Sequence, residues 1–146
     1  MPEFKRLSIE DIQSVSRLEK ETFGKEAWTE KDYLEVLGLS YAYYLVAYDG
    51  DTLLGSCGLR NMCGDGEITN VMIAPEARRK GIAYSMLTEL MERTREIGVK
   101  NYTLEVRSKN DPAIALYKKL GFKEEGKRPH FYTEPEDDAI IMWIRQ

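Results

Sequence analysis

The chain has 146 residues, of which 42% are hydrophobic and 32% charged, and its formal net charge is -4 at pH 7. This balance fits one globular domain over residues 1–146 with a core of ordinary size. The acidic charge argues against a general nucleic-acid or membrane-surface binder, because such proteins need a broad basic face.

The N-terminal residues predict one strand and two helices. Residues 4–8 (FKRLS) are typical of a short strand. Ser8 and Asp11 resemble a capping box that starts a helix, and Thr29 and Asp32 repeat the signal for a second one. The apolar face of the first helix is expected to carry Ile12, Val15, Leu18 and Phe23. The apolar side of the second is expected to carry Leu34 and Leu37.

Three strands are predicted next. Residues 43–48 (YYLVAY) and 52–60 (TLLGSCGLR) are β-prone runs that flank Asp49 and Gly50, a strong tight-turn signal, so they predict a hairpin. After a glycine-bearing turn, residues 67–74 (EITNVMIA) predict the third strand.

A long helix is predicted over residues 81–97, ended by Gly98. Its apolar residues recur at helical spacing: Ile82, Ala83, Met86, Leu87, Leu90, Met91 and Ile97. The strand 102–106 (YTLEV) follows, with Glu105 on the face opposite Leu104 and its apolar neighbours.

The last part of the chain predicts a short helix and two closing strands. Asp111 and Pro112 are typical of an N-cap and first turn, and Gly121 would end the helix over residues 113–120. The closing strands are expected at 121–128 and 137–144. The order of elements predicts an α/β domain with its sheet between helices.

A basic run lies at the start of the long helix. Arg78, Arg79 and Lys80 precede Gly81. Cations are unexpected here, because a helix N-terminus already presents unpaired N–H groups and the positive end of the helix dipole. A strand, glycine-bearing turn and helix in this order can hold a phosphate group. The segment is neither a Walker loop nor a dinucleotide fingerprint. The alternative is that the three basic side chains bind no ligand and are simply solvated on a surface loop.

The cysteines and the histidine exclude several kinds of site. Cys57 and Cys63 have no histidine or cysteine cluster beside them, so we expect two reduced thiols and no metal. His130 is the one histidine, which argues against paired-histidine metal sites and a serine triad. The chain also lacks an apolar run of the roughly 18 residues that span a bilayer, and it begins without the apolar stretch of a signal peptide. We expect a cytoplasmic protein.

Several segments resemble one family in the right order. Residues 71–91 (VMIAPEARRKGIAYSMLTELM) resemble the R/Q-x-x-G-x-G/A segment of the GCN5-related N-acetyltransferase (GNAT) superfamily. Residues 104–122 (LEVRSKNDPAIALYKKLGF) resemble a segment of its RimI type, the N-terminal protein acetyltransferases that modify a ribosomal protein at its terminal alanine. Residues 26–30 (EAWTE) and 137–142 (DDAIIM) match two further RimI-type segments. The resemblance covers nearly the whole chain, most strongly 67–142.

The resemblance implies a mixed, mostly antiparallel sheet whose central strands splay into a V-shaped acetyl-CoA cleft. By this resemblance the strand residues Val71, Met72 and Ile73 pair with the pantetheine arm, and Asn110 also contacts the cosubstrate. The pyrophosphate is expected to meet the backbone N–H groups of Arg79, Lys80, Gly81, Ile82, Ala83 and Tyr84.

The same resemblance assigns the chemistry to two residues. It implies Glu105 as the base and Tyr117 as the acid. Glu67 is a rival base, acting directly or through water. From the residues alone, Glu105 could equally be a solvated strand glutamate, and packing would explain the ring of Tyr117.

The acceptor site is expected near the end of the chain. Arg128, Phe131 and Tyr132 match a family segment with the pattern Arg-Arg-x-Tyr-Tyr. Pro129 replaces the second arginine and Phe131 the first tyrosine, so the aromatic bulk is kept while polar contacts are lost. We expect Trp28 to be a packing residue rather than a substrate contact.

The function that the resemblance implies is transfer of acetyl to a protein N-terminus, the alanine of a small-subunit ribosomal protein, by direct attack in a ternary complex. The expected partner is that basic protein tail, without direct nucleic-acid or membrane contact, and the chain is expected to be a monomer or weak homodimer. One alternative is a relative that acetylates a small amine, a lysine or another protein terminus. A second is a non-catalytic acyl-CoA-binding module.

Overall fold

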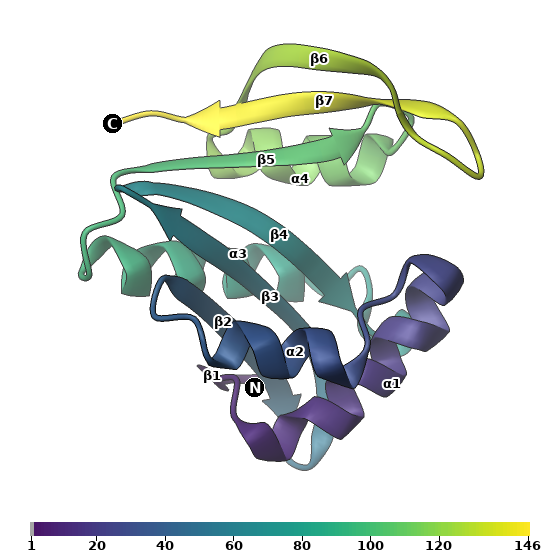
Figure 1. Cartoon of the computed structure of the whole chain (residues 1–146), viewed down its shortest axis with the longest axis vertical. Coiled ribbons are helices and arrows are strands. Elements are labelled where there is room, and N and C mark those ends of the chain that lie inside the picture. Colours follow the sequence, from purple (N-terminus) through teal and green to yellow (C-terminus); the bar gives the residue numbers. More distant parts are fainter. Residues whose placement is uncertain (1) are drawn as a thin grey trace.

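The computed structural model describes residues 2–146 as a seven-stranded sheet with helices on both faces (Figure 1). The strand order is β1-β2-β3-β4-β5-β7-β6. The strands are β1 (Glu3–Arg6), β2 (Ala42–Asp49), β3 (Thr52–Met62), β4 (Asp65–Ile73), β5 (Asn101–Arg107), β6 (Lys123–Tyr132) and β7 (Asp137–Ile144). Only β4 and β5 pair in parallel. The predicted mixed, mostly antiparallel sheet is confirmed.

Four α-helices cover the sheet. They are α1 (Ile12–Phe23), α2 (Glu30–Leu37), α3 (Ile82–Arg95) and α4 (Asp111–Leu120). Short 3-10 turns lie at Ile9–Asp11, Gly24–Glu26 and Pro75–Ala77. In Figure 1, α1 and α2 lie in front of the strands β2 to β4, and α3 lies behind them. The buried side chains of α3, such as Met86, Leu87 and Leu90, therefore pack on the face of the sheet opposite α1 and α2.

Both predicted capping boxes are present. Thr29 caps α2 and exchanges hydrogen bonds with Asp32, whose backbone N–H donates to Thr29 Oγ1 at 3.3 Å. At the first helix start, the Asp11 carboxylate accepts from the Ser8 N–H at 2.9 Å and the Ser8 hydroxyl at 3.0 Å. A 3-10 turn leads from this box into α1.

Replacing Asp11 with asparagine should lower the free energy of unfolding at pH 7 by about 1 to 3 kcal/mol, because buried hydrogen bonds are lost. Burial raises the pKa of Asp11, but hydrogen bonds from Ser8 and the Tyr48 hydroxyl, at 2.8 Å, outweigh it and hold this pKa below its usual value. The stabilisation is thus present above the unfolded pKa of about 3.9 and is lost as pH falls through the lower folded pKa. Urea unfolding of both proteins at several pH values should show the gap closing below about pH 4.

A gap that stayed constant down to the lowest pH at which both proteins fold would contradict this account of Asp11. Glu10 is exposed beside it in the same turn. Glu10→Gln is the matched control and should leave the unfolding free energy within about 0.5 kcal/mol of the wild type.

Four predicted apolar positions are wrong. Phe23, Leu34, Leu37 and Ile97 are exposed, at 44%, 48%, 38% and 57%. In α2 the buried pair is Tyr33 and Val36 instead, because the aromatic ring of Tyr33 packs beneath the helix. Ile97 lies beyond the end of α3 at Arg95, so its spacing no longer places it on the core face.

Several predicted boundaries also shift; the strand predicted at 121–128, for example, is β6, which runs over Lys123–Tyr132. The first strand ends at Arg6 rather than residue 8, because Ser8 already serves the capping box. The N-cap of α4 is Asn110, not Asp111: the Asn110 side chain accepts from the Ala113 N–H at 3.3 Å. The predicted cosubstrate contact Asn110 therefore also fixes the start of a helix.

The strands β4 and β5 separate soon after they pair. They are in register only over Asp65–Glu67 and Asn101–Thr103, whereas β4 continues to Ile73 and β5 to Arg107. Figure 1 shows the two strands diverging from this shared end. A bulge at Thr69, where the pairing with β3 shifts, bends β4 at the same place. The predicted splayed central strands are confirmed.

Candidate active site

The separated strands open a cleft of about 330 Å³. Its walls come from the end of α1, the turn before α2, the strands β4 and β5, the start of α4 and the end of β6. The lining residues are Glu19, Phe23, Glu26, Trp28, Ile68, Thr69, Asn70, Val71, Leu104, Glu105, Val106, Arg107, Asn110, Tyr117 and Tyr132. Five of the sequence-predicted site residues therefore line one cavity: Val71, Glu105, Asn110, Tyr117 and Tyr132.

Glu105 lies on β5 with its carboxylate open to this cleft. Strand alternation buries its neighbours Leu104 and Val106 while the Glu105 side chain keeps 32% of its surface exposed. The Arg128 guanidinium lies 3.7 Å from the Glu105 carboxylate. Both partners are partly exposed, so this ion pair contributes little to stability and leaves the carboxylate available.

Tyr117 reaches the same cleft from α4. Its ring packs edge-on against Phe122 at 5.9 Å and is 8% exposed. Within residues 2–146 its hydroxyl has no hydrogen-bond partner, although it lines a cavity. Burial raises the pKa of Tyr117 to about 12, so the hydroxyl stays protonated at neutral pH and can donate a hydrogen bond.

The turn between β4 and α3 forms a row of free backbone donors. Gly81 caps α3 in the left-handed conformation with φ of 75°, and Arg79 shares this region with φ of 64°. The first hydrogen bond of the helix runs from the Ser85 N–H to the Gly81 carbonyl at 3.1 Å. In the part of the chain that is described, the N–H groups from Arg79 to Tyr84 donate to no protein acceptor, so they are available to an anion.

The side chains of this turn are solvated. Arg79, Lys80 and Tyr84 are exposed, and Ala83 is half-buried. Arg78 is exposed as well, but its guanidinium donates to the Ile73 carbonyl at 3.3 Å, which ties the turn to the end of β4. Of the strand residues predicted to meet the pantetheine arm, Val71 lines the cleft, Met72 is buried and Ile73 is half-buried.

Two loops border the opening of the cleft on the face that carries α1 and α2. Arg107, at the end of β5, donates to the carbonyls of Pro135 at 2.8 Å and Thr133 at 3.3 Å and stacks over the Tyr132 ring at 4.4 Å. Its guanidinium also lies 3.6 Å from the Glu26 carboxylate, in the turn before α2. Arg107 thus links the β6–β7 loop to the α1–α2 turn.

Phe131 and Tyr132 form an aromatic pair at this border, with ring centroids 5.0 Å apart. Phe131 is 47% exposed, whereas Tyr132 lines the cleft. Burial raises the pKa of Tyr132, and the negative charge of Glu105 adds to this shift. The three residues predicted to shape an acceptor site, with Arg128 beside Glu105, therefore lie together.

The structure does not bring Glu67 to the cleft. Glu67 lies where β4 still pairs with β5, opposite Thr103, and faces Arg60 on β3. It is exposed and is not among the residues that line the cavity.

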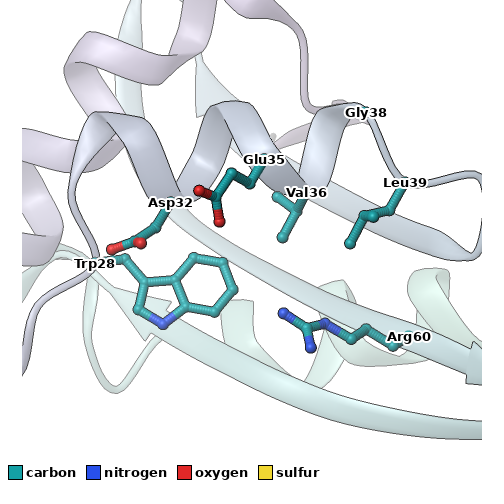
Figure 2. A pocket seen from close by; sticks show the side chains of 7 residues that line it. All are labelled: Trp28, Asp32, Glu35, Val36, Gly38, Leu39 and Arg60. Carbon is teal, nitrogen blue, oxygen red and sulfur yellow. The ribbon is translucent and has the colours of Figure 1, made fainter.

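Two residues that were not predicted to line the cleft, Glu19 and Trp28, do so. Trp28 was expected to pack, and its ring does contact Tyr33 at 5.2 Å and Tyr44 at 5.8 Å. The same side chain, however, lines the cleft and a second pocket of about 600 Å³ beneath α2, where it faces Arg60 (Figure 2). Glu19 is 2% exposed on α1. A glutamate on the apolar stripe of a predicted helix was the signal that could have found it.

The other sequence predictions concern metal ligands, the two cysteines and membrane-spanning segments. Across residues 2–146 there is no group of His, Cys, Asp and Glu side chains that could hold a metal ion. Cys57 is buried and Cys63 exposed, both as free thiols. No helix among those residues is both long and apolar enough to cross a bilayer.

An open sheet with a splayed central pair, a free N–H cradle and a cleft lined by a carboxylate and a buried tyrosine are typical of acyl-CoA-dependent transferases. Residues 12–122 match the acetyltransferase (GNAT) family. The chain belongs to this family, whose members are acetyl-CoA-dependent N-acetyltransferases.

Single proteins show in more detail what the chain is similar to. A Bacillus subtilis protein whose name proposes ribosomal protein bS18-alanine N-acetylation is 36% identical over 141 residues, which cover 96% of this chain and 93% of that protein. The crystal structure of the Escherichia coli ribosomal-protein-S18-alanine N-acetyltransferase superposes with a TM-score of 0.89 at 25% identity, covering 99% and 93% of the two chains. The PaiA N-acetyltransferase of Thermoplasma acidophilum, solved with coenzyme A, has the same fold, with a TM-score of 0.80 at 23% identity over 100% and 99%.

Proposed function

We propose that this chain transfers acetyl from acetyl-CoA to the α-amino group of a protein N-terminus, and that the acceptor is the N-terminal alanine of ribosomal protein bS18. The observation that carries the proposal is the parting of β4 and β5, which places Glu105 and Tyr117 in one cleft. The relatives named for bS18-alanine acetylation support the choice of acceptor. We treat residues 1–146 as one catalytic unit in the cytoplasm.

The cosubstrate fits the α3 side of the cleft. The free edge of β4 at Val71, Met72 and Ile73 offers backbone groups to the amides of the pantetheine arm, because β5 no longer pairs there. The N–H groups from Arg79 to Tyr84 meet the pyrophosphate, and the Asn110 amide contacts the arm from the start of α4. Bound acetyl-CoA supplies an activated acetyl thioester.

The acceptor reaches the cleft from the opposite face, beside α1 and α2. An N-terminal amine has a pKa near 8 and is mostly protonated at pH 7, so it must lose a proton before it attacks the acyl carbon. Glu105 takes this proton, directly or through one water. Glu67 stays the rival base, in which case a chain of waters would have to reach it from the cleft.

Attack of the neutral amine nitrogen on the acyl carbon forms the amide carbon–nitrogen bond as the carbon–sulfur bond breaks. The nitrogen then loses a second proton to solvent, and the thiolate that leaves gains a proton. The Tyr117 hydroxyl donates a hydrogen bond to the sulfur as its charge develops. A pKa of about 12 for Tyr117 lies above that of an ordinary thiol, about 8.5. Tyr117 therefore acts chiefly by stabilising the negative charge that develops on the sulfur, and the thiolate can take its proton from solvent.

The variant Tyr117→Phe should lower kcat by about 10-fold to 100-fold and leave the KM for acetyl-CoA within a factor of two, because only a donor to the leaving sulfur is lost. The wild-type rate should show no alkaline decline assignable to Tyr117 below about pH 11, since burial raises its pKa to about 12. Steady-state kinetics at several pH values measure both. Full activity of the phenylalanine variant would remove the hydroxyl from the mechanism.

Acceptor choice is assigned to Arg128, Phe131 and Tyr132. Their aromatic surface suits the first residues of a peptide, and the acidic balance of the chain suits a basic ribosomal-protein tail.

The test of the proposed function is mass spectrometry of peptides that copy the bS18 N-terminus, with the same peptides carrying a blocked α-amine as controls. Transfer to polyamines or lysine side chains but not to the free N-terminus would contradict the proposed acceptor. Acetyl-CoA binding without transfer to any amine would favour a binding module.

A further inference from the structure

Glu19 is a carboxylate buried in the cleft wall without a cationic partner. It lies on the core face of α1, beside Val15 and Leu18. No Lys, Arg or His nitrogen in residues 2–146 approaches it within ion-pair distance. Burying a carboxylate without a cation costs free energy even where hydrogen bonds satisfy it, so its presence at a cavity suggests a role beyond packing.

Three neutral donors hold the Glu19 carboxylate. Glu19 Oε1 accepts from the Tyr33 hydroxyl at 2.6 Å and from the Asn70 side-chain amide at 3.4 Å, and Oε2 accepts from the Trp28 backbone N–H at 2.9 Å. Burial raises the pKa of Tyr33, so this hydroxyl remains a donor. Each donor comes from a different segment: α2, the bulged part of β4 and the turn before α2.

Two of these partners are themselves cleft residues. Asn70 lies beside the bulge at Thr69, and both accept or share hydrogen bonds with the Tyr44 hydroxyl, at 3.3 Å and 2.6 Å. Trp28 lines both the cleft and the pocket beneath α2. Glu19, Trp28, Thr69 and Asn70 together form what we call the acceptor wall, on the sheet face that carries α1 and α2.

We propose that Glu19 is a positioning residue for the acceptor, which acts through Asn70 and Trp28 by fixing the acceptor wall. The inference rests on the proposed transfer to an amine that enters from this face. The cradle from Arg79 to Tyr84 begins α3 on the other face of the sheet, so a change in the acceptor wall leaves cosubstrate binding intact. A carboxylate suits this part because it accepts from all three donors at once, whereas an amide must turn one of its own N–H groups toward a donor.

The experiment compares Glu19→Gln, Asn70→Ala and their double variant with Glu21→Gln, a matched change at an exposed glutamate on the same helix. With a peptide that the wild type acetylates, Glu19→Gln and Asn70→Ala should each raise the acceptor KM about tenfold. The KM for acetyl-CoA should stay within a factor of two, and Glu21→Gln should match the wild type. Because both changes disrupt one wall, the double variant should resemble the single ones rather than multiply their effects.

Two results would overturn the proposal. One is a fall in Tm with both KM values unchanged, which is the behaviour of a residue that only stabilises the fold. The other is multiplication of the two effects in the double variant. Asn70→Ala keeps the test decisive if Glu19→Gln folds poorly, because it cuts the link to β4 while leaving α1 unchanged.

A second readout does not depend on the acceptor. In a Trp143→Phe background, 5-fluorotryptophan places a single fluorine reporter at Trp28. Its resonance should shift or broaden in Glu19→Gln and stay in place in Glu21→Gln; an unchanged resonance overturns the proposed link to Trp28. If the wild type acetylates no peptide, the proposed function fails, and this spectrum still decides whether Glu19 positions the wall.

Discussion

Replacing Glu105 with glutamine should lower kcat by about 10²-fold to 10⁴-fold, the usual contribution of a general base. Glutamine has nearly the same size but cannot accept the proton of the acceptor amine. Affinity for acetyl-CoA should stay nearly unchanged, because Glu105 lies on β5 whereas the cradle follows the end of β4, at the start of α3. The fold should also tolerate the change, since the pair with Arg128 at 3.7 Å is partly exposed. Single-turnover kinetics with an N-terminal peptide measure the chemical step.

Glu67→Gln is the matched control for this prediction. Glu67 is also a strand glutamate, but it lies where β4 and β5 remain paired and does not line the cleft. We expect it to alter kcat by less than about threefold. Full activity of Glu105→Gln, together with a large loss in Glu67→Gln, would transfer the role of base to Glu67.

Replacing Gly81 with valine should raise the KM for acetyl-CoA by about 10-fold to 100-fold. Gly81 has φ of 75°, and a β-branched residue is strained in this region by about 1 to 3 kcal/mol. No protein atom lies within 4 Å of the position that a Cβ would take. The added side chain therefore meets no protein neighbour, and the loss arises from the altered turn and from bulk placed where the pyrophosphate approaches.

Lys80→Ala is the informative comparison for Gly81→Val. Lys80 is an exposed cation next to the cap, so its loss removes a screened attraction and should raise the KM for acetyl-CoA only about threefold. Steady-state kinetics at varied acetyl-CoA concentrations measure the KM of both variants. If the lysine change proves the more harmful, side-chain charge rather than the backbone N–H cradle binds the pyrophosphate.

Local signals in the sequence predicted much of this fold. The capping pairs Ser8 with Asp11 and Thr29 with Asp32 predicted two helix starts, because each pair acts within four residues. Asp49 and Gly50 predicted the hairpin of β2 and β3 for the same reason. Glu105 could be placed opposite Leu104 and Val106 because strand alternation is local.

Contacts between distant segments could not be predicted in this way. The hydrogen bond from Asn70 to Glu19 joins residues 51 positions apart, and the bond from Arg107 to Pro135 spans 28. The resemblance predicted Glu105 and Tyr117 as the catalytic pair. Asn110 as a helix cap and Trp28 as a lining residue of two cavities emerged only from the packing of whole elements. The buried face of α2 was predicted wrongly for the same reason. Tyr33 on this helix is buried and donates a hydrogen bond to Glu19 on α1, a contact between separate elements.

The two sides of the cleft differ in the groups that they offer to a ligand. On the α3 side, the free donors from Arg79 to Tyr84 are backbone groups, which tolerate sequence change. On the other side, side chains such as Trp28 and Tyr132 form the surface that an acceptor would meet. Phe131, which departs from the family pattern, packs against Tyr132 on this second side. Acceptor preference should therefore respond to substitution more strongly than cosubstrate binding.

A crystal structure with a bisubstrate analogue, in which coenzyme A is joined through an acetyl bridge to an N-terminal peptide, tests the central claim most directly. We expect the pyrophosphate to lie on the N–H groups from Arg79 to Tyr84, as the proposed function requires. We also expect the peptide nitrogen within about 3 Å of Glu105, or one water away, and the bridging sulfur beside the Tyr117 hydroxyl. A peptide nitrogen directed to Glu67, or an analogue bound outside the cleft between β4 and β5, would contradict it.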